Sequence, residues 1–235
     1  MSARDRVIVG LDVATEAQAR AIVAALGDSA SFYKIGLQLL TAAGPALMRE
    51  LVDAGTQVFL DLKLFEIPNS VAGAVRAAGE QGVTMVTVHA SAGSTILRAA
   101  VEAATPWPAL RVLALTVVTS LHDADLREVG IVASVSDQVL RLARLAEAAG
   151  CHGVIASPHE VATLRAALGP QMLIVTPGIQ LADEGASDPA RAATPAYAIA
   201  AGATHIVLGR AITQAADARA AFAAVCAEVE QAGAR

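Results

Sequence analysis

An aspartate and a lysine two positions apart form the pair with the clearest potential for chemistry. Asp61 and Lys63 lie in the segment DLKLFEIPN, and side chains two apart on a strand point the same way. A second lysine, Lys34, ends another apolar run, and Glu66 follows three residues after Lys63. Charges of alternating sign stabilise one another. The set fits a structural ion-pair network or a preorganised charge array around a charged substrate, and we favour the array.

Two glycine turns near the end of the chain suggest what such a substrate carries. TPGI contains Pro177 and Gly178, and LGRAI contains Gly209 and Arg210. We expect each turn to place glycine backbone amides at a helix start, where N–H groups and the helix dipole favour an anion. A single glycine there is an ordinary turn, but two with an arginine predict a phosphate site.

The other reactive residue types predict no metal and no bound cofactor. The histidines show no metal-ligand spacing, and we expect His89 to be a hydrogen-bonded structural residue. No GxSxG elbow or Cys/His nucleophile pair is present. Cys151 and Cys226 lie far apart, which is typical of buried thiols in a reducing cytosol.

Strands and helices must position these side chains. Along the sequence, short runs of β-branched residues alternate with Ala- and Leu-rich stretches of helical period. We predict strands at 6–12, 31–36, 57–63, 83–89, 110–118, 152–157, 172–177 and 204–209. Eight units favour a closed (β/α)₈ barrel, the TIM barrel of the α/β class, as one domain over residues 1–235. An open doubly wound sheet is the rival, but no GxGxxG follows the first strand.

Length and composition limit the partners. The chain has 235 residues, 55% of them hydrophobic, and a net charge of −5 without any block of basic residues. It has neither an apolar run of membrane-spanning length nor the pattern of a signal peptide. We therefore predict a soluble cytoplasmic protein that binds neither nucleic acid nor a membrane.

A barrel of this kind places its active site at the carboxyl ends of the strands. Polar or special residues end nearly every predicted strand: Asp12, Lys34, Asp61, Lys63, His89, Thr119, Ser120, Ser157, Pro177, Gly178, Gly209 and Arg210. Convergence from so many strands favours a site over scattered solvated charges.

Ordered motifs recur over nearly the whole chain: VGLDV (9–13), YKIG (33–36), FLDLKLFEIPNS (59–70), VHASAG (88–93), LTVVTS (115–120), TPGI (176–179) and GRAITQ (209–214). Together they resemble the bacterial type of the orotidine 5′-monophosphate decarboxylase family, which makes UMP. The resemblance implies a cofactor-free TIM barrel that converts orotidine 5′-monophosphate to UMP and CO₂. It also implies a homodimer whose active sites are completed across the interface.

The resemblance assigns roles to particular residues. Lys63 would donate the proton to C6 of the pyrimidine, and Asp61 would sit against the departing carboxylate with Lys34 beside it. The other expected substrate contacts are Asp12 at the ribose, Thr119 and Ser120 at the pyrimidine, and Pro177, Gln180, Gly209 and Arg210 at the phosphate. Three more residues would reach into the partner subunit's site: Glu66, Ile67 and Ser70.

The sequence departs from the family pattern at four positions. Glu66 replaces an aspartate, Ser70 a threonine and Gln180 an arginine, and Pro189 stands where a phosphate-contacting glutamine is usual. Because a shift of ~1 Å in a preorganised site can cost ~100-fold in rate, these changes bear on turnover and phosphate affinity.

Two alternative functions remain open. One is a magnesium-dependent phosphosugar decarboxylase or aldolase of the same barrel group, against which the segment Ile67–Asn69 argues. The other is a weakened relative that only binds nucleotides or serves as a structural dimer. The presence of Lys34, Asp61 and Lys63 argues against that, since binding alone needs no such array.

Overall fold

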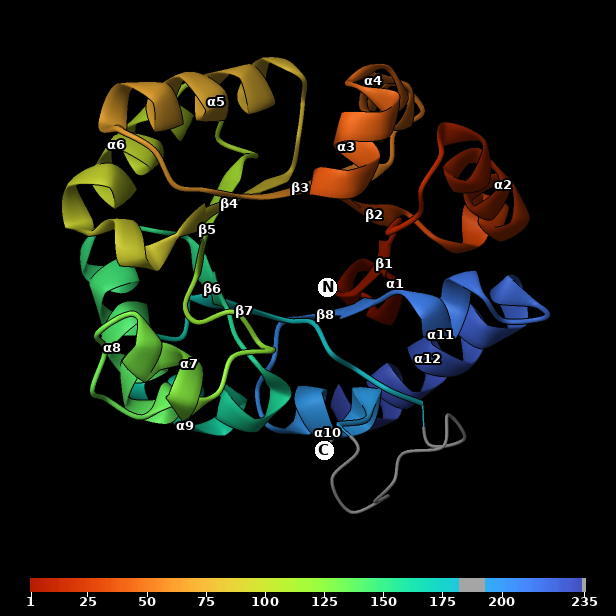
Figure 1. Cartoon of the computed structure of the whole chain (residues 1–235). Coiled ribbons are helices and arrows are strands. Elements are labelled where there is room, and N and C mark those ends of the chain that lie inside the picture. The colour runs from red at the N-terminus through yellow and green to blue at the C-terminus, as the bar shows by residue number, and fades with distance from the viewer. Residues whose placement is uncertain (182–192, 234–235) are drawn as a thin grey trace.

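The computed structural model describes residues 1–181 and 193–233, and its centre is a closed barrel of eight parallel strands (Figure 1). The strands follow chain order around the barrel: β1 (Val7–Gly10), β2 (Phe32–Gly36), β3 (Gln57–Leu64), β4 (Met85–His89), β5 (Arg111–Leu115), β6 (Gly153–Ile155), β7 (Leu173–Thr176) and β8 (His205–Leu208). Pairing of β1 with β8 closes the ring, so the open doubly wound sheet is excluded.

Most helices surround the ring on its outside, whereas the short first helix lies within the outline of the ring, beside β1 and β8 (Figure 1). The helices are α1 (Ala3–Arg6), α2 (Glu16–Leu26), α3 (Leu37–Ala43), α4 (Ala46–Asp53), α5 (Pro68–Glu80), α6 (Ser94–Ala104), α7 (Asp123–Glu128), α8 (Val135–Ala148), α9 (Val161–Ala167), α10 (Pro195–Ala200), α11 (Arg210–Thr213) and α12 (Ala218–Gly233). Short 3₁₀ turns are η1 (Gly27–Ser29), η2 (Ala90–Ala92) and η3 (Pro158–Glu160). Among the described residues, no helix is long and apolar enough to cross a membrane.

Local sequence signals explain where the helices begin and end. Thr15 caps α2 in a reciprocal capping box with Gln18, and Gly27 ends that helix with a positive φ of 49°. Pro68 begins α5, at a position where its missing N–H costs no hydrogen bond.

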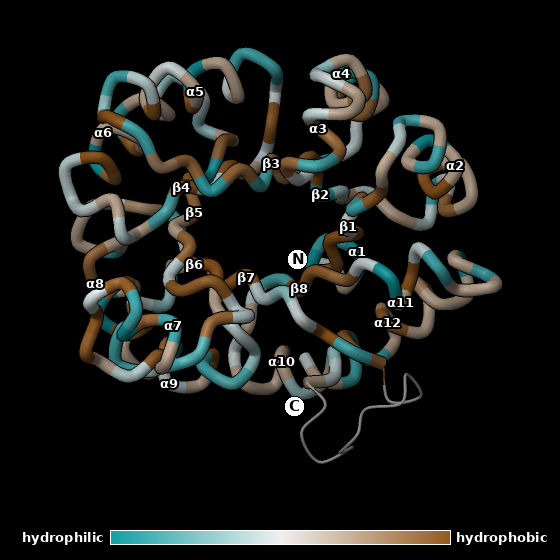
Figure 2. Tube along the Cα trace, viewed as in Figure 1, coloured by the Kyte–Doolittle hydropathy of each residue, from teal (hydrophilic) through white to brown (hydrophobic). Residues whose placement is uncertain are grey.

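Two apolar layers form the core, and hydrophobic residues gather along the strands (Figure 2). The larger layer lies between strands and helices. The smaller one fills the barrel, and every strand contributes to it: Ile8, Phe32, Phe59, Met85, Leu113, Leu115, Ile155, Val175 and Val207. Strand side chains alternate between the two faces, so within a strand the residue two positions after a member of the smaller layer also points inward.

This alternation places polar residues directly above the smaller apolar layer, which we call the barrel plug. Lys34 follows Phe32 by two positions in β2, and Asp61 follows Phe59 by two in β3. The apolar layer therefore forms the floor of a polar site at the carboxyl ends of the strands.

All eight predicted strands are present, and the predicted TIM barrel is confirmed. The main difference in extent is at 110–118, because β5 ends at Leu115. There the Thr116 hydroxyl donates to the carbonyl of Ile155 at 2.9 Å as the chain leaves the strand. Both cysteines are free thiols: Cys151 is buried, as predicted, and Cys226 is half-buried.

Candidate active site

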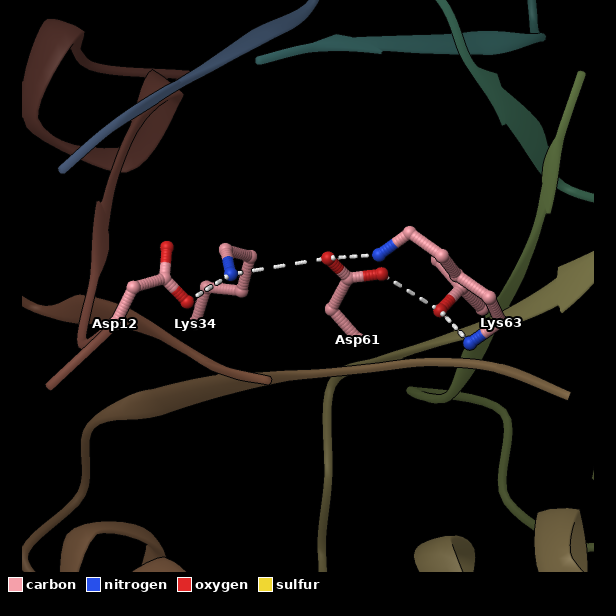
Figure 3. Close-up of polar contacts among 5 residues, drawn as sticks. Asp12, Lys34, Asp61 and Lys63 are labelled. Carbon is pink, nitrogen blue, oxygen red and sulfur yellow. Dashed lines mark hydrogen bonds and ion pairs between the residues drawn. The ribbon is translucent and has the colours of Figure 1, made fainter. Parts of the chain in front are cut away.

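Four charged side chains form a continuous row of alternating sign at the carboxyl ends of the first three strands (Figure 3). Asp12 follows β1, Lys34 lies in β2, and Asp61 and Lys63 lie in β3. Nζ of Lys34 lies 2.8 Å from Oδ1 of Asp12 and 3.7 Å from Oδ2 of Asp61. Nζ of Lys63 lies 2.8 Å from the same Oδ2. Asp61 is thus shared by two ammonium groups, as the sequence predicted.

Burial divides the row into a closed middle and two open ends. The side chains of Lys34 and Asp61 are only 10% and 13% exposed, whereas Asp12 and Lys63 are 56% and 36% exposed. Buried charges are tolerated when they are paired, and each buried member has a partner of opposite charge. The groups available to a ligand are therefore the Asp12 carboxylate and the Lys63 ammonium.

Two glycines make room for the Asp12–Lys34 pair. A Cβ on Gly36 would lie 3.2 Å from Oδ1 of Asp12 and 3.4 Å from Nζ of Lys34. A Cβ on Gly10 would lie 3.1 Å from Oδ2 of Asp12. Because these distances are tighter than ordinary van der Waals contact, a side chain at either position would press on the ion pair.

Lys63 has an unusual backbone. Its φ is +52°, the only positive φ of a non-glycine residue in the described part of the chain. The register between β3 and β4 also shifts between Leu60 and Leu64, as in a β-bulge. A left-handed conformation costs a residue of this type ~1–2 kcal/mol, and such strain clusters at active sites. At Lys63 this strained backbone conformation accompanies a side chain that bonds to Asp61 of the same strand.

A second region of the barrel mouth holds the predicted phosphate residues. A cavity of about 930 Å³ lies at the ends of β1, β7 and β8, and Asp12, Gly178, Gln180, Gly209 and Arg210 are among its lining residues. Among the described residues of that lining, Arg210 carries the only positive charge. Asp12 belongs to both the cavity and the charge row, so the two regions adjoin.

Within the described residues, a helix directly follows one of the two glycine turns. Gly209 directly precedes α11, as predicted. After Gly178, whose φ is +80°, residues up to 181 form no helix. Pro177 is half-buried at the end of β7. Pro189 lies outside the described residues.

The residues predicted to contact the pyrimidine lie apart from the charge row. Thr119 and Ser120 are exposed in the segment after β5. Thr119 lines a separate cavity of about 510 Å³ together with Ser157. In the part of the chain that the structure describes, neither hydroxyl forms a hydrogen bond with the charge row.

The residues predicted to act across an interface are all exposed. Ile67 is 62% exposed, and Ser70 lies in the first turn of α5. The Glu66 carboxylate accepts a 2.6 Å hydrogen bond from the N–H of Ile67, and it joins none of the ion pairs between described residues. Within one chain, the fourth charge of the row is therefore Asp12.

His89 has the structural surroundings expected from the sequence. Its Nδ1 accepts a hydrogen bond from the N–H of Ser91, and its ring stacks on Phe65 with centroids 5.7 Å apart. Burial, and then the nearby positive charge of Lys63, lower the pKa of His89. Both causes favour the neutral form of the ring beside the lysine.

One polar residue of the site was absent from the sequence-based candidates. Thr87 in β4 is completely buried, and its hydroxyl lies 2.9 Å from both Oδ1 of Asp61 and the backbone N of Lys63. The strand period contained a signal, because Thr87 lies two positions after Met85 of the barrel plug and therefore points inward.

Comparison with known proteins identifies the family. The model of the orotidine 5′-phosphate decarboxylase / HUMPS family matches residues 5–225. The chain belongs to this family. Among curated members, an orotidine 5′-phosphate decarboxylase of Rhodopseudomonas palustris (strain HaA2) is 49% identical, covering 97% of this chain and 96% of the relative. One of Anaeromyxobacter dehalogenans is 46% identical, covering 97% and 99%.

Two solved structures share the fold of this chain. The crystal structure of orotidine 5′-phosphate decarboxylase from Lactobacillus acidophilus has a TM-score of 0.86 and 37% identity, covering 95% of this chain and 98% of that one. An uncharacterized conserved protein from Geobacillus kaustophilus has a TM-score of 0.84 and 31% identity, covering 95% and 99%. The resemblance drawn from the sequence motifs is confirmed.

Proposed function

We propose that this chain decarboxylates orotidine 5′-monophosphate to UMP and CO₂ without a cofactor, with Lys63 as the proton donor. The observation that carries the proposal is the row Asp12–Lys34–Asp61–Lys63, whose exposed ammonium lies beside a buried carboxylate. The names of the relatives, orotidine 5′-phosphate decarboxylases matched over nearly their full length, support the same activity.

The chemistry requires a cation where negative charge develops. The bond between C6 and the carboxylate carbon breaks, CO₂ leaves, and the electron pair stays on C6. A positive group placed in advance at C6 lowers the energy of that state more than it lowers the energy of the substrate. Lys63 supplies the charge and then the proton, and its exposure to solvent allows it to be protonated again.

Asp61 acts on Lys63 and on the substrate carboxylate. It holds the Lys63 ammonium by a 2.8 Å hydrogen bond, and this fixes the direction from which the proton arrives. In our proposal the departing carboxylate lies beside Asp61, so loss of CO₂ relieves the repulsion between two anions. Lys34, paired with Asp12 and Asp61, balances the charge of the buried middle.

The rest of the substrate extends toward the large cavity. Asp12 accepts hydrogen bonds from the ribose hydroxyls, and Arg210 binds the phosphate together with Gly209 and Gln180, which line the same cavity. Pro177 precedes the lining residue Gly178 and supports this turn. Thr119 and Ser120 contact the pyrimidine. Binding energy from the phosphate, distant from C6, then helps to place C6 against Lys63.

We also propose a homodimer with shared active sites. Phe65 and Ile67 are 63% and 62% exposed in the loop after β3, next to the charge row, and large apolar side chains in such positions favour burial by a partner. In the dimer, Glu66, Ile67 and Ser70 complete the site of the other subunit.

One assay separates this function from its alternatives. The purified chain is given orotidine 5′-monophosphate in the presence of a chelator, and loss of ultraviolet absorbance is followed. We expect rapid loss that disappears in Lys63→Ala and persists in Arg141→Ala, which removes an exposed cation of α8. Tight UMP binding without turnover would favour the binding protein, and magnesium-dependent turnover of a phosphosugar alone would favour the sister enzymes.

A further inference from the structure

We propose that Thr87 is a positioning residue, whose single hydroxyl sets the Asp61 carboxylate and the Lys63 backbone relative to each other. This inference rests on the proposed function of the site. Thr87 touches no reacting atom, and it acts through the two residues that do.

The hydrogen bonds of Thr87 connect the two residues directly. Its Oγ1 donates to Oδ1 of Asp61 and accepts from the backbone N–H of Lys63, both at 2.9 Å. A hydroxyl has one proton to donate, and the carboxylate takes it, so the direction of both bonds is determined. Since Thr87 is fully buried, water does not compete for either partner.

The pairing of β3 with β4 explains why the side chain of Thr87 bonds to the backbone of Lys63. Leu60 pairs with Val86 and Leu64 pairs with Val88, so residues 61–63 face Thr87 alone. Three residues opposite one cannot all make regular backbone hydrogen bonds across the pair. The N–H of Lys63 bonds to the threonine side chain instead.

This bond supports the left-handed backbone of Lys63. Strained conformations persist where the surroundings hold them, and here the N–H is anchored by Thr87 while Nζ is anchored by Asp61. Loss of the hydroxyl leaves a buried N–H without its acceptor, which favours a return of the lysine to an ordinary strand conformation.

The second bond of Thr87 controls how the Asp61 carboxylate is turned. Oδ2 faces the two lysine ammoniums, at 2.8 and 3.7 Å, and Oδ1 receives the Thr87 proton. Without that proton the carboxylate can rotate about its Cβ–Cγ bond, and Oδ2 is no longer held between the cations. Both effects displace Nζ of Lys63 from the position where the proton is needed.

Threonine variants test the inference kinetically. Thr87→Val keeps the shape and removes the hydroxyl, and we expect kcat to fall about 100-fold, as for a displacement of ~1 Å, with KM changed less than about threefold. Thr87→Ser keeps the hydroxyl and is expected to retain kcat within about fivefold of wild type. The control is Thr116→Val, which removes another buried hydroxyl, one that donates to the carbonyl of Ile155.

A second readout does not depend on activity. Lys34 and Lys63 are the only lysines of the chain, so protein labelled with ¹⁵N at lysine Nζ reports on the charge row alone. We expect Thr87→Val to move the Lys63 signal, and Thr87→Ser and Thr116→Val to leave both signals in place. A wild type that does not decarboxylate would refute the proposed function, while the spectra would still test the role of the hydroxyl.

The inference is overturned by either of two results. One is a Thr87→Val protein whose kcat matches that of Thr116→Val; the other is unchanged lysine signals in Thr87→Val. If Thr87→Val does not fold, Thr87→Cys replaces it, because a thiol of similar size forms only weak hydrogen bonds. Its kcat is expected well below that of Thr87→Ser, and equal rates for the two would contradict the proposal.

Discussion

The Lys34 ammonium donates a 2.8 Å hydrogen bond to the Asp12 carboxylate, which joins a buried lysine to the most exposed member of the charge row. Asp12 is also the only residue of the row that lines the large cavity. It therefore connects the place where charge develops to the place where we expect the phosphate.

Asp12→Asn is expected to lower kcat/KM by about 10- to 100-fold, since a hydrogen bond to a charged group contributes ~1.5–3 kcal/mol. The amide accepts ribose hydroxyl bonds more weakly and no longer neutralises Lys34. Steady-state kinetics check this, with Asp53→Asn at the exposed end of α4 as the control. An unchanged kcat/KM would show that Asp12 contributes neither to substrate binding nor to turnover.

Glu66→Asp is expected to raise turnover by about tenfold or more, because the shorter side chain restores the reach usual in this family. Glu80→Asp makes the same change at the exposed end of α5 and is expected to have no effect. If kcat stays at the wild-type value in Glu66→Asp, the extra methylene does not limit the reaction.

Gln180→Arg is expected to lower KM about tenfold, because a second cation beside Arg210 adds a charge-assisted bond to phosphate. The gain should shrink as salt is added, since exposed charges are screened. Gln231→Arg in α12 is the matched control for net charge. A KM that is unaffected at low salt would argue against phosphate binding in this cavity.

Complementation tests the shared sites. Lys63→Ala and Ser70→Ala proteins are each expected to lose activity, and mixing them should restore part of it. A mixed dimer contains one site with intact Lys63 from one chain and intact Ser70 from the other. Mixtures without any recovery would show that each chain builds its own site.

Ile67→Asp, which places a charge on an exposed apolar position, is expected to weaken the dimer in analytical ultracentrifugation.

Stability should fall as the solution is acidified from about pH 6.5 toward 4. Burial lowers the pKa of His205 from 6.5 to about 4, so the unfolded chain binds a proton in that range while the folded chain does not. The shift corresponds to ~3 kcal/mol of stability that is present above pH 6.5 and lost as pH falls through 4. Denaturant unfolding at several pH values measures it. In His205→Gln, the free energy of unfolding should depend less on pH. An unchanged pH dependence would show that other groups cause the loss of stability.

The sequence predicted the barrel well because its signals are local and repeated. Eight apolar runs suffice to locate the strands, and parallel strands bring their carboxyl ends together whatever lies between them. Lys34, Asp61 and Lys63 were therefore expected to lie close together, and they do.

The parts that could not be predicted depend on pairing between strands. Nothing in DLKLFEIPN signals that Lys63 adopts a positive φ, because lysine rarely does so. The register shift that places Thr87 opposite three residues depends on where β4 pairs with β3. Asp12 was predicted at the ribose, but its bond to Lys34 required the actual spacing of β1 and β2.

The concentration of both lysines in the charge row has a practical consequence for handling the protein. Amine-reactive dyes, cross-linkers and surface-coupling reagents find only the amino terminus, Lys34 and Lys63, and Lys63 is the more exposed of the two lysines. Conjugation through lysine amines would therefore modify the proposed active site. An engineered surface cysteine offers a safer point of attachment, since burial raises the pKa values of Cys151 and Cys226 to about 12 and about 11 and keeps both thiols protonated.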